Sequence, residues 1–254
     1  MAEPQQWDAA VQGVDVVVNC VGILREWRRA TYECVHRDAP AALARACARA
    51  GTRRLVHVSA LGLHESARSR FILSKIGGER AIRGGGSTYT IVRPSLLDGP
   101  GGYGARWIRA LARLPIHAVP ADAAGRIAVL DVRDAGEAIA ALCEDATGSG
   151  SRDVEIGGTV ARTLHEHLAA LRRMHSDVPA WCLRIPPAPA RFLSHACDLF
   201  HISPFSFGHL ELLRLDNKPA ANLLPALLGR APQSIGGEAA DHGLASGIPS
   251  ADRI

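Results

Sequence analysis

The chain has 254 residues, of which 47% are hydrophobic and 21% are charged, and its formal net charge is +4. A chain of this length can bury a sizeable core, and this composition is ordinary for a folded protein rather than a disordered one. The arginines are scattered through alanine-rich segments and are not gathered with aromatic residues, which argues against a nucleic-acid-binding surface.

Three features bear on where the protein works. No run of about 18 apolar residues is present, so no membrane-spanning helix is predicted. The first residues lack the charged-then-apolar pattern of a signal peptide. The six cysteines show no C-x-x-C spacing, which indicates reduced cysteines in the protein core. We therefore expect a cytoplasmic protein, and peripheral association with a membrane stays open.

The eleven histidines form no metal-binding motif such as H-E-x-x-H. His165 and His167 are two residues apart on an expected helix, so they point to different faces and are predicted to be solvent-exposed. No metal site is predicted.

Helices and strands are expected to alternate along the first half of the chain, which is typical of a parallel α/β sheet. The expected elements are a helix ending over 5–12, a strand at 14–18, a helix at 38–50, a strand at 55–59, a helix containing Phe71 and Lys75, and a strand at 88–93.

Local signals support these boundaries. Asp38 is a plausible N-cap, Pro40 suits the first helical turn, and Gly51 suits the stop. The run Gly84–Gly86 follows a helix and precedes a strand, which is the wrong end for binding phosphate, so it is interpreted as a loop.

The second half continues this pattern and then changes character. The expected elements are a glycine-rich loop at 95–102, a helix at 103–113, a strand at 127–132, a helix at 134–143, a strand at 153–156, a helix opened by the capping box Thr163–Glu166, a strand at 181–185, and helices near 190–200 and 205–215. Asp131 is interpreted as a loop carboxylate and Asp134 as a helix N-cap. Pro186–Pro189 is interpreted as a rigid connector.

The chain is thus divided into a nucleotide-binding part at 1–150, a small and mostly helical C-terminal region at 151–235 for substrate or partner, and a disordered tail at 236–254. The tail is predicted from its glycine, alanine, serine and charged residues, which show no periodicity.

The stretch with the clearest chemical pattern runs from the expected strand at 55–59 into the next helix. Ser59 ends that strand, and Phe71 and Lys75 are four residues apart, so they project from one face of the helix. A strand-end serine can point at the same space.

Five motifs in this order carry a family resemblance: Val16–Leu24, Leu55–Gly62, Ser74–Lys75 with Glu79, Thr90–Ser95 and Val129–Asp134. They resemble the extended and atypical short-chain dehydrogenases/reductases. Within these, the chain looks most like bacterial proteins similar to the NAD(P)H-binding accessory subunit of respiratory complex I. The resemblance covers roughly residues 10 to 235 and extends to the stretches at 203–214 and 227–232.

The resemblance implies a catalytic serine, a tyrosine that transfers the proton, and a lysine four residues later that holds the nicotinamide ribose. Ser59 and Lys75 match the serine and the lysine, but the tyrosine position is Phe71. Phenylalanine has no proton to donate, so the resemblance implies a weak or inactive oxidoreductase.

The same resemblance implies binding of NAD or NADP. Asn19, Val21 and Gly22 would lie near the adenosine half, Ser59 and Lys75 near the reacting half, and Pro94 and Ser95 would wall the nicotinamide.

Two features of the family are missing. The sequence has no G-x-x-G-x-x-G turn between a strand and a helix, which holds the cofactor pyrophosphate. It begins about where the third strand of that fold ends, so a partial Rossmann-like, doubly wound sheet is expected, without the first β-α-β-α-β segment of roughly 60 residues. Cofactor binding by the chain as written is therefore in doubt.

The strand at 14–18 is then expected at an exposed sheet edge, which invites self-association or pairing with a partner chain. A late start codon or a truncated gene is the first explanation of the missing segment, and a short protein completed by a partner is the second.

Three functions stay open. The first is an NAD(P)-binding protein of the short-chain dehydrogenase type with weak or no redox activity. The second is a structural or assembly factor, associated with respiratory complex I or with another partner chain. The third is an active reductase or epimerase that uses another proton donor, with Tyr89 and Tyr103 as candidates.

Overall fold

The computed structural model describes residues 4–145, 150–200 and 205–236. The elements in chain order are α1 (Pro4–Val11), β1 (Val16–Asn19), the π-helix η1 (Glu33–Asp38), α2 (Ala39–Ala50), β2 (Arg54–Val58), α3 (Arg70–Arg83), β3 (Tyr89–Pro94), β4 (Leu97–Asp98), α4 (Tyr103–Ala112), β5 (Ile116–Pro120), β6 (Leu130–Asp131), α5 (Val132–Glu144), β7 (Arg152–Ile156), α6 (Leu164–Arg173), β8 (Trp181–Ile185), α7 (Pro187–Phe200), α8 (Phe207–Arg214) and α9 (Leu224–Leu228).

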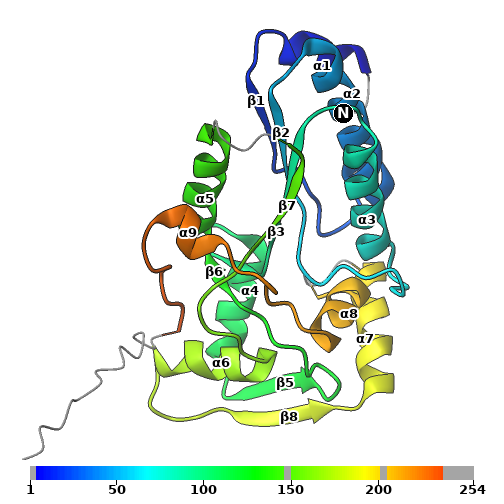
Figure 1. Ribbon diagram of the computed structural model, residues 1–254. Helices are drawn as coiled ribbons and strands as arrows, with labels where there is room; N and C mark the ends of the chain where they lie inside the picture. The colour runs from blue at the N-terminus through cyan, green and yellow to red at the C-terminus, as the bar shows by residue number, and fades with distance from the viewer. Residues whose placement is uncertain (1–3, 146–149, 201–204, 237–254) are drawn as a thin grey trace, which may run out of the picture.

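The centre of the fold is a four-stranded parallel sheet in the order β1-β2-β3-β7 (Figure 1). One face packs against α1, α2 and α3 through a cluster that includes Leu43, Leu55 and Ile91. The other face packs against α5 and α9 through a cluster that includes Val56 and Val92. Adjacent β-strand residues point to opposite faces, so Leu55 and Val56 belong to different clusters. This arrangement confirms the predicted α/β fold with a parallel sheet between two helical layers.

In the described chain, β1 lies at the edge of this sheet and pairs only with β2. Val18 is 41% exposed, although β-branched runs of this kind usually belong to buried strands. The prediction of an edge strand at this position is confirmed.

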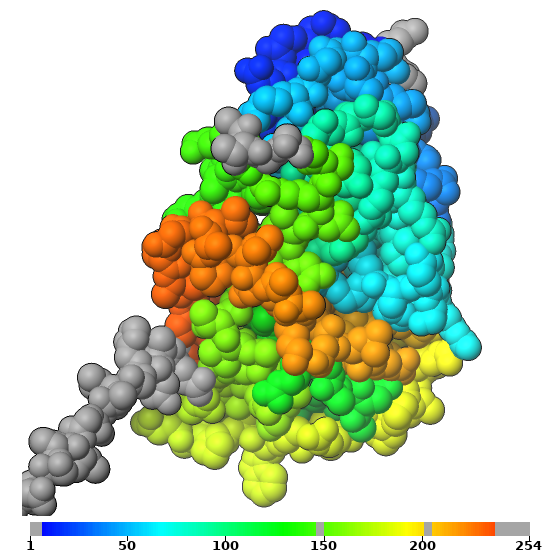
Figure 2. Space-filling model, in the orientation of Figure 1, coloured from blue at the N-terminus to red at the C-terminus, as the bar shows by residue number. Residues whose placement is uncertain are grey.

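The lower part of the molecule in Figure 1 is built from α4, α6, α7, α8 and the two-stranded parallel ribbon of β5 and β8. Residues 217–228 then return to the central sheet, where α9 packs against α5, and they form part of the orange surface in Figure 2. Leu224 on this returning segment is fully buried in the cluster under α5.

The proposed division of the chain stays a prediction. The sheet itself extends past residue 150, since β7 is its fourth strand. Apart from Gly236, the predicted tail lies outside the described residues.

The N-cap position of Asp38 before α2 is confirmed, but its side chain makes no capping hydrogen bond, and the N-cap predicted at Asp134 is wrong. Asp38 does not cap α2 with its side chain, because the π-helix η1 runs into α2 without a break. Asp131 is the N-cap of α5 and accepts a hydrogen bond from the backbone amide of Arg133, whereas Asp134 is a fully buried carboxylate within the helix. Asp134 pairs with Arg230 on the returning C-terminal segment.

Three further predictions need correction. Pro187 and Pro189 belong to the first turns of α7, where proline lacks only a hydrogen bond that the helix start cannot make, so this stretch is not a connector. The strand expected at 127–132 is reduced to β6. Cys20 and Cys182 are exposed, while Cys47 and Cys197 are buried as expected.

The capping box is confirmed, since the Thr163 hydroxyl accepts a hydrogen bond from the Glu166 amide and the Glu166 carboxylate accepts one from the Thr163 amide.

Within the described residues, no helix has both the length and the apolar character needed to cross a membrane.

Candidate functional site

The predicted site residues lie at the carboxyl ends of β1, β2 and β3 and on α3, which covers one side of the sheet. Along β2, Leu55, His57 and Ser59 alternate with Val56 and point to the α2–α3 side. Ser59 therefore faces the helix that carries Lys75. Ligands of open α/β sheets bind at this edge.

Ser59 is 5% exposed, and its hydroxyl has no hydrogen-bond partner of normal geometry among the described residues. The hydroxyl is still close enough to the carboxylate of Glu79 to help lower its pKa. The hydroxyl is thus buried beside the Glu79 carboxylate without a well-formed hydrogen bond, an arrangement that costs free energy.

Lys75 lies beside the backbone that follows β1. Its Nζ lies 5.7 Å from the centroid of the Phe71 ring, and an added Cβ on Gly22 would be 3.9 Å from the same nitrogen. Burial lowers the pKa of Lys75 to about 8, and the negative charge of Glu79 opposes this shift. The ammonium group thus lies in a poorly solvated position where it makes no ion pair with a described residue.

Phe71 is a packing residue in an aromatic cluster. Its ring meets Tyr32 and His36 edge-on, each at 5.7 Å between ring centroids, and stacks on His209 at 5.5 Å. Phe71 is 6% exposed. The ring therefore fills the space next to Lys75 and offers no acidic proton there.

His36 connects the loop after β1 to α3, and nothing in the sequence pattern singled it out. Its Nε2 accepts a hydrogen bond from the Ile23 amide at 3.1 Å. Its Nδ1 lies 2.9 Å from the Ser74 hydroxyl, which donates to the carbonyl of Phe71. Burial, with the charge of Lys75 as the next cause, lowers the pKa of His36 to about 3, so the ring is neutral. The fixed imidazole holds the Gly22 loop against the lysine helix.

Asn19 and His57 form a second fixed pair at this edge. The side-chain amide of Asn19 donates to Nδ1 of His57 at 3.0 Å, and its oxygen accepts from the Val21 amide at 3.1 Å. Asn19 is buried, while Val21 is 49% exposed. Asn19 thus shapes the turn after β1, in which the Val21 side chain is half-exposed and Gly22 lies near Lys75.

A network of ion pairs surrounds Glu79, next to Ser59 and Lys75. The Arg93 guanidinium makes a two-pronged hydrogen bond with the Glu79 carboxylate, with Nε at 2.8 Å from Oε1. Arg83 bonds both Glu79 and Asp153, at 3.1 Å and 2.7 Å. Burial raises the pKa of Glu79, but the hydrogen bonds from Arg93 and the nearby Ser59 hydroxyl outweigh this and hold the pKa below its usual value. Glu79 is therefore ionised next to Ser59 and Lys75.

Pro94 and Ser95 end β3 and are largely used in internal contacts. The Pro94 carbonyl accepts from the Leu61 amide at 2.9 Å. The Ser95 hydroxyl donates to the carbonyl of Asn217 at 2.6 Å, which fastens the returning C-terminal segment to the end of the strand. A role of Ser95 toward a cofactor would therefore depend on its backbone.

Tyr89 is wrong as a candidate proton donor. It pairs with Leu55 at the amino-terminal ends of β2 and β3, which is the opposite edge of the sheet from Ser59. Tyr103 begins α4 and is 50% exposed. The phenol that lies against Phe71 is Tyr32, and its hydroxyl donates to the carbonyl of Leu24 at 3.0 Å.

A cleft of about 520 Å³ opens between the start of α3 and helices α7 and α8. Its aromatic lining is Tyr32, Phe71 and Phe207, and its charged lining is Arg25, Glu26, Arg68, Arg70, Arg191 and Asp198. Arg25 pairs with Asp198, and Arg70 pairs with Glu26. Arg68 and Arg191 form no ion pair with a described residue, so the cleft has an excess of positive charge.

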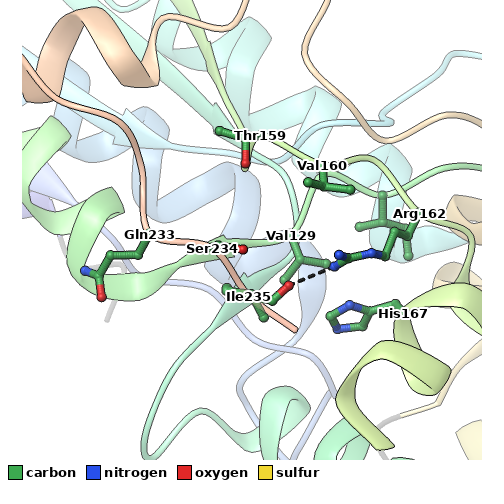
Figure 3. Close-up of a pocket in the computed structure, with 9 residues that line it drawn as sticks. Val129, Thr159, Val160, Arg162, His167, Gln233, Ser234 and Ile235 are labelled. Carbon is green, nitrogen blue, oxygen red and sulfur yellow. Dashed lines mark hydrogen bonds between the residues drawn. The ribbon is translucent and has the colours of Figure 1, made fainter. Parts of the chain in front are cut away.

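A second cavity of about 10 Å³ lies beneath the returning segment near 233–235 (Figure 3). Arg162 and His167 point into it from one side, and Thr159 and Ser234 face them. His167 is 1% exposed, so the prediction that it is solvated is wrong. Burial lowers the pKa of His167 to about 4. This volume holds about one water molecule.

Comparison with known proteins supports the fold and the nucleotide-binding region. Residues 1–110 match the model of the NAD(P)H-binding family. The chain is 31% identical over 144 residues to the ceramide reductase of Caulobacter vibrioides, a stretch that covers 56% of this chain and 45% of that protein. It is 36% identical over 104 residues to the mitochondrial NADH dehydrogenase 1 alpha subcomplex subunit 9 of Mus musculus, covering 37% of this chain and 27% of that one.

The matched stretches therefore span less than half the length of these two relatives. Among solved structures, a nucleoside-diphosphate-sugar epimerase from Staphylococcus aureus superposes with a TM-score of 0.73 at 17% identity, over 92% of this chain and 79% of that chain. At this identity the likeness shows the fold. The matches and the parallel sheet together confirm the resemblance to the extended short-chain dehydrogenase/reductase superfamily, with residues 1–110 carrying the NAD(P)H-binding pattern.

Proposed function

We propose that this chain is an NAD(P)-binding protein of the short-chain dehydrogenase type that binds its nucleotide with little or no oxidoreductase turnover. The observation that carries the proposal is the group formed by Ser59, Lys75 and Phe71. Ser59 supplies a buried hydroxyl with no well-formed hydrogen bond to a described residue, Lys75 an ammonium beside the Gly22 backbone, and Phe71 an aromatic ring where a proton donor is needed. When bound, the nucleotide would supply a hydride donor or acceptor.

The residues present fit the ribose-bearing, reacting half of such a group. The ammonium of Lys75 can donate to ribose hydroxyls, and the Ser59 hydroxyl can bond a ligand oxygen. Phe71 replaces the general acid, which typically contributes 10²- to 10⁴-fold to a rate. Binding can therefore persist where turnover is lost.

The cleft beside Phe71 supports an anionic substrate or ligand. Four arginines line it against two carboxylates, and aromatic rings cover part of its wall. Arginine and aromatic surfaces together suit a phosphate or carboxylate attached to an apolar or ring-bearing group.

The six free cysteines fit a reducing compartment, in line with a cytoplasmic location.

The test is a titration of the chain with NADPH, followed by nucleotide fluorescence. Lys75→Met is expected to weaken binding by about tenfold, because one charge-assisted hydrogen bond is lost. Arg80→Met, on the same helix but paired with exposed Glu65, is the matched control and is expected to leave affinity unchanged. Equal affinity of wild type and Lys75→Met would contradict the proposed site.

Phe71→Tyr tests the reason for weak turnover. With NADPH and a panel of carbonyl acceptors, this variant is expected to raise any reductase rate by about 10²-fold or more, since it restores a general acid one turn before Lys75. An unchanged rate, with NADPH still bound, would show that this helix face does not meet a reacting group.

A structural or assembly role is the second candidate, and the exposed edge of β1 favours it. Among the described residues β1 pairs on one side only, and Val14 and Val18 are 37% and 41% exposed. Such an edge accepts a strand from another chain. The similarity to a subunit of mitochondrial NADH dehydrogenase is consistent with a protein partner. If the edge drives association, Val18→Lys is expected to lower the mass measured by light scattering after gel filtration.

A further inference from the structure

The ribbon of β5 and β8 carries its apolar side chains on the outside. Ile116 pairs with Trp181, and Ala118 with Leu183, so these four side chains share one face of the ribbon. Ile116 is 52% exposed, Trp181 80% and Leu183 57%. On the reverse face His117 and Val119 are buried, and Val119 packs with residues of α6.

The neighbouring loops extend this apolar face. Arg172 donates from Nη1 to the carbonyl of Leu114 at 2.9 Å and from Nε to the carbonyl of Val178 at 2.7 Å. The Trp181 amide donates to the carbonyl of Pro115 at 2.9 Å. Leu114 is 48% and Val178 67% exposed. We call these five residues the ribbon patch: Leu114, Ile116, Val178, Trp181 and Leu183.

The surroundings of the ribbon patch are basic. Segments 111–119 and 172–185 contain four arginines and one aspartate, Asp177, so their net charge is +3, compared with +4 for the whole chain. His175 is a further titratable group in these segments. Arg113 and Arg173 are exposed and form no ion pair with a described residue, whereas Arg184 is paired with Val119 and points to the reverse face of the ribbon. The ribbon lies at the lower end of the molecule, where the green and yellow segments form the surface (Figures 1 and 2).

We propose that the ribbon patch docks onto the surface of an anionic membrane. Exposed tryptophan next to aliphatic residues suits the boundary between lipid headgroups and acyl chains, and the arginines suit anionic headgroups. Contiguous exposed apolar surface of this kind marks an interaction site.

A second copy of the chain is the competing occupant, and charge argues against it. In a two-fold symmetric dimer through this patch, each copy would bring its own arginines to the interface. Like charges placed opposite one another disfavour that contact, whereas an anionic surface complements them.

The test is co-sedimentation of the full chain with vesicles. One set contains phosphatidylcholine alone, and the other contains phosphatidylcholine mixed with phosphatidylserine. The chain is expected to bind the mixed vesicles at least tenfold more tightly, and added salt is expected to weaken this binding. Equal binding to both sets, or no binding to either, overturns the proposal.

Variants locate the surface. Trp181→Ser combined with Leu183→Ser is expected to reduce binding to the mixed vesicles by at least tenfold, while Trp27→Ser, which alters a 65% exposed tryptophan in the loop after β1, leaves it unchanged. Arg113→Glu, at the residue that precedes Leu114 of the patch, is expected to reduce binding about tenfold. Arg45→Glu, an exposed arginine on α2, is its matched control.

Two measurements distinguish membrane docking from self-association and from loss of folding. Thermal melting checks that each variant is folded, and light scattering in the absence of vesicles gives the oligomeric state. If the wild type is a dimer, the Trp181 and Leu183 variant is monomeric, and neither binds vesicles, the patch is a dimer interface and the proposal is wrong.

Discussion

Lys75 is held in a position that disfavours its own charge. Its ammonium lies between the Phe71 ring and the Gly22 backbone, and burial lowers its pKa from the usual 10.5 to about 8. Glu79 is on the next turn of α3, but its carboxylate is bonded by Arg93 and Arg83. A bound group that accepts hydrogen bonds would satisfy the ammonium.

The lowered pKa of Lys75 predicts a specific dependence of stability on pH. The charged form of Lys75 is disfavoured in the folded state, so the buried charge lowers the free energy of unfolding. This loss of stability is full below pH 8. It disappears as the pH rises to 10.5, where the lysine of the unfolded chain also becomes neutral. Lys75→Met is therefore expected to raise the melting temperature relative to wild type at pH 7, by a margin that shrinks between pH 8 and 10.5.

Melting curves at a series of pH values check this expectation. Arg80→Met removes an exposed cation from the same helix, and the difference between its melting temperature and that of wild type is expected to be the same at every pH in this range. If the difference in melting temperature between Lys75→Met and wild type stays constant from pH 7 to 10.5, the lysine is well solvated in the folded protein.

At the scale of elements, α3 and η1 approach so closely that the contact requires glycine. A Cβ added to Gly78 would lie 1.9 Å from the carbonyl oxygen of His36. A Cβ on neighbouring Gly77 would meet only the side chain of Arg37, at 3.3 Å. The close contact at Gly78 sets the distance between the two helices, and so holds the His36 ring within reach of Ser74 and Ile23.

Gly78→Ala is therefore expected to destabilise the protein by about 3 kcal/mol, since backbone must move to accept the methyl group. Gly77→Ala is expected to change stability by less than about 1 kcal/mol, because a flexible arginine side chain can move and alanine favours helix. Chemical denaturation of both variants measures the difference. Equal effects of the two substitutions would show that η1 can shift without cost.

At the scale of the whole molecule, the C-terminal segment completes the core of the central sheet. Asn222 makes two hydrogen bonds with the backbone of Gly157, and the amide of Leu223 donates to the carbonyl of Glu155. Leu224 lies fully buried against α5. The nucleotide-binding sheet and this segment are therefore expected to unfold together.

Leu224→Ala is expected to cost about 2–5 kcal/mol and to lower a single cooperative transition. Leu223→Ala, at a neighbouring side chain that is 41% exposed, is the matched control and is expected to cost less than about 1 kcal/mol. Denaturation followed both by tryptophan fluorescence and by circular dichroism tests this. Separate transitions by the two probes would show that the segment and the sheet are independent units.

Much of the fold follows from local pattern. The β-branched runs of β1, β2 and β3, the capping box of α6 and the glycine stop at Gly51 each depend on neighbouring residues, and each is present in the structure. The short strands β4 and β5 and the helix α9 are not evident in the sequence, and the strand expected at 127–132 is shortened to β6. The partners of these short strands lie far along the chain, and local propensity is weak.

The sequence by itself determined the α/β class, the spacing of Phe71 and Lys75 on one helix, and the lack of a phenol at that position, since these depend on residue type and on helical or strand period. The tertiary structure alone decided that Ser59 faces that helix, that His36 and His209 enclose Phe71, and that the apolar side of the β5–β8 ribbon points outward. These features depend on which distant segments pack together, and side-chain periodicity does not specify that choice.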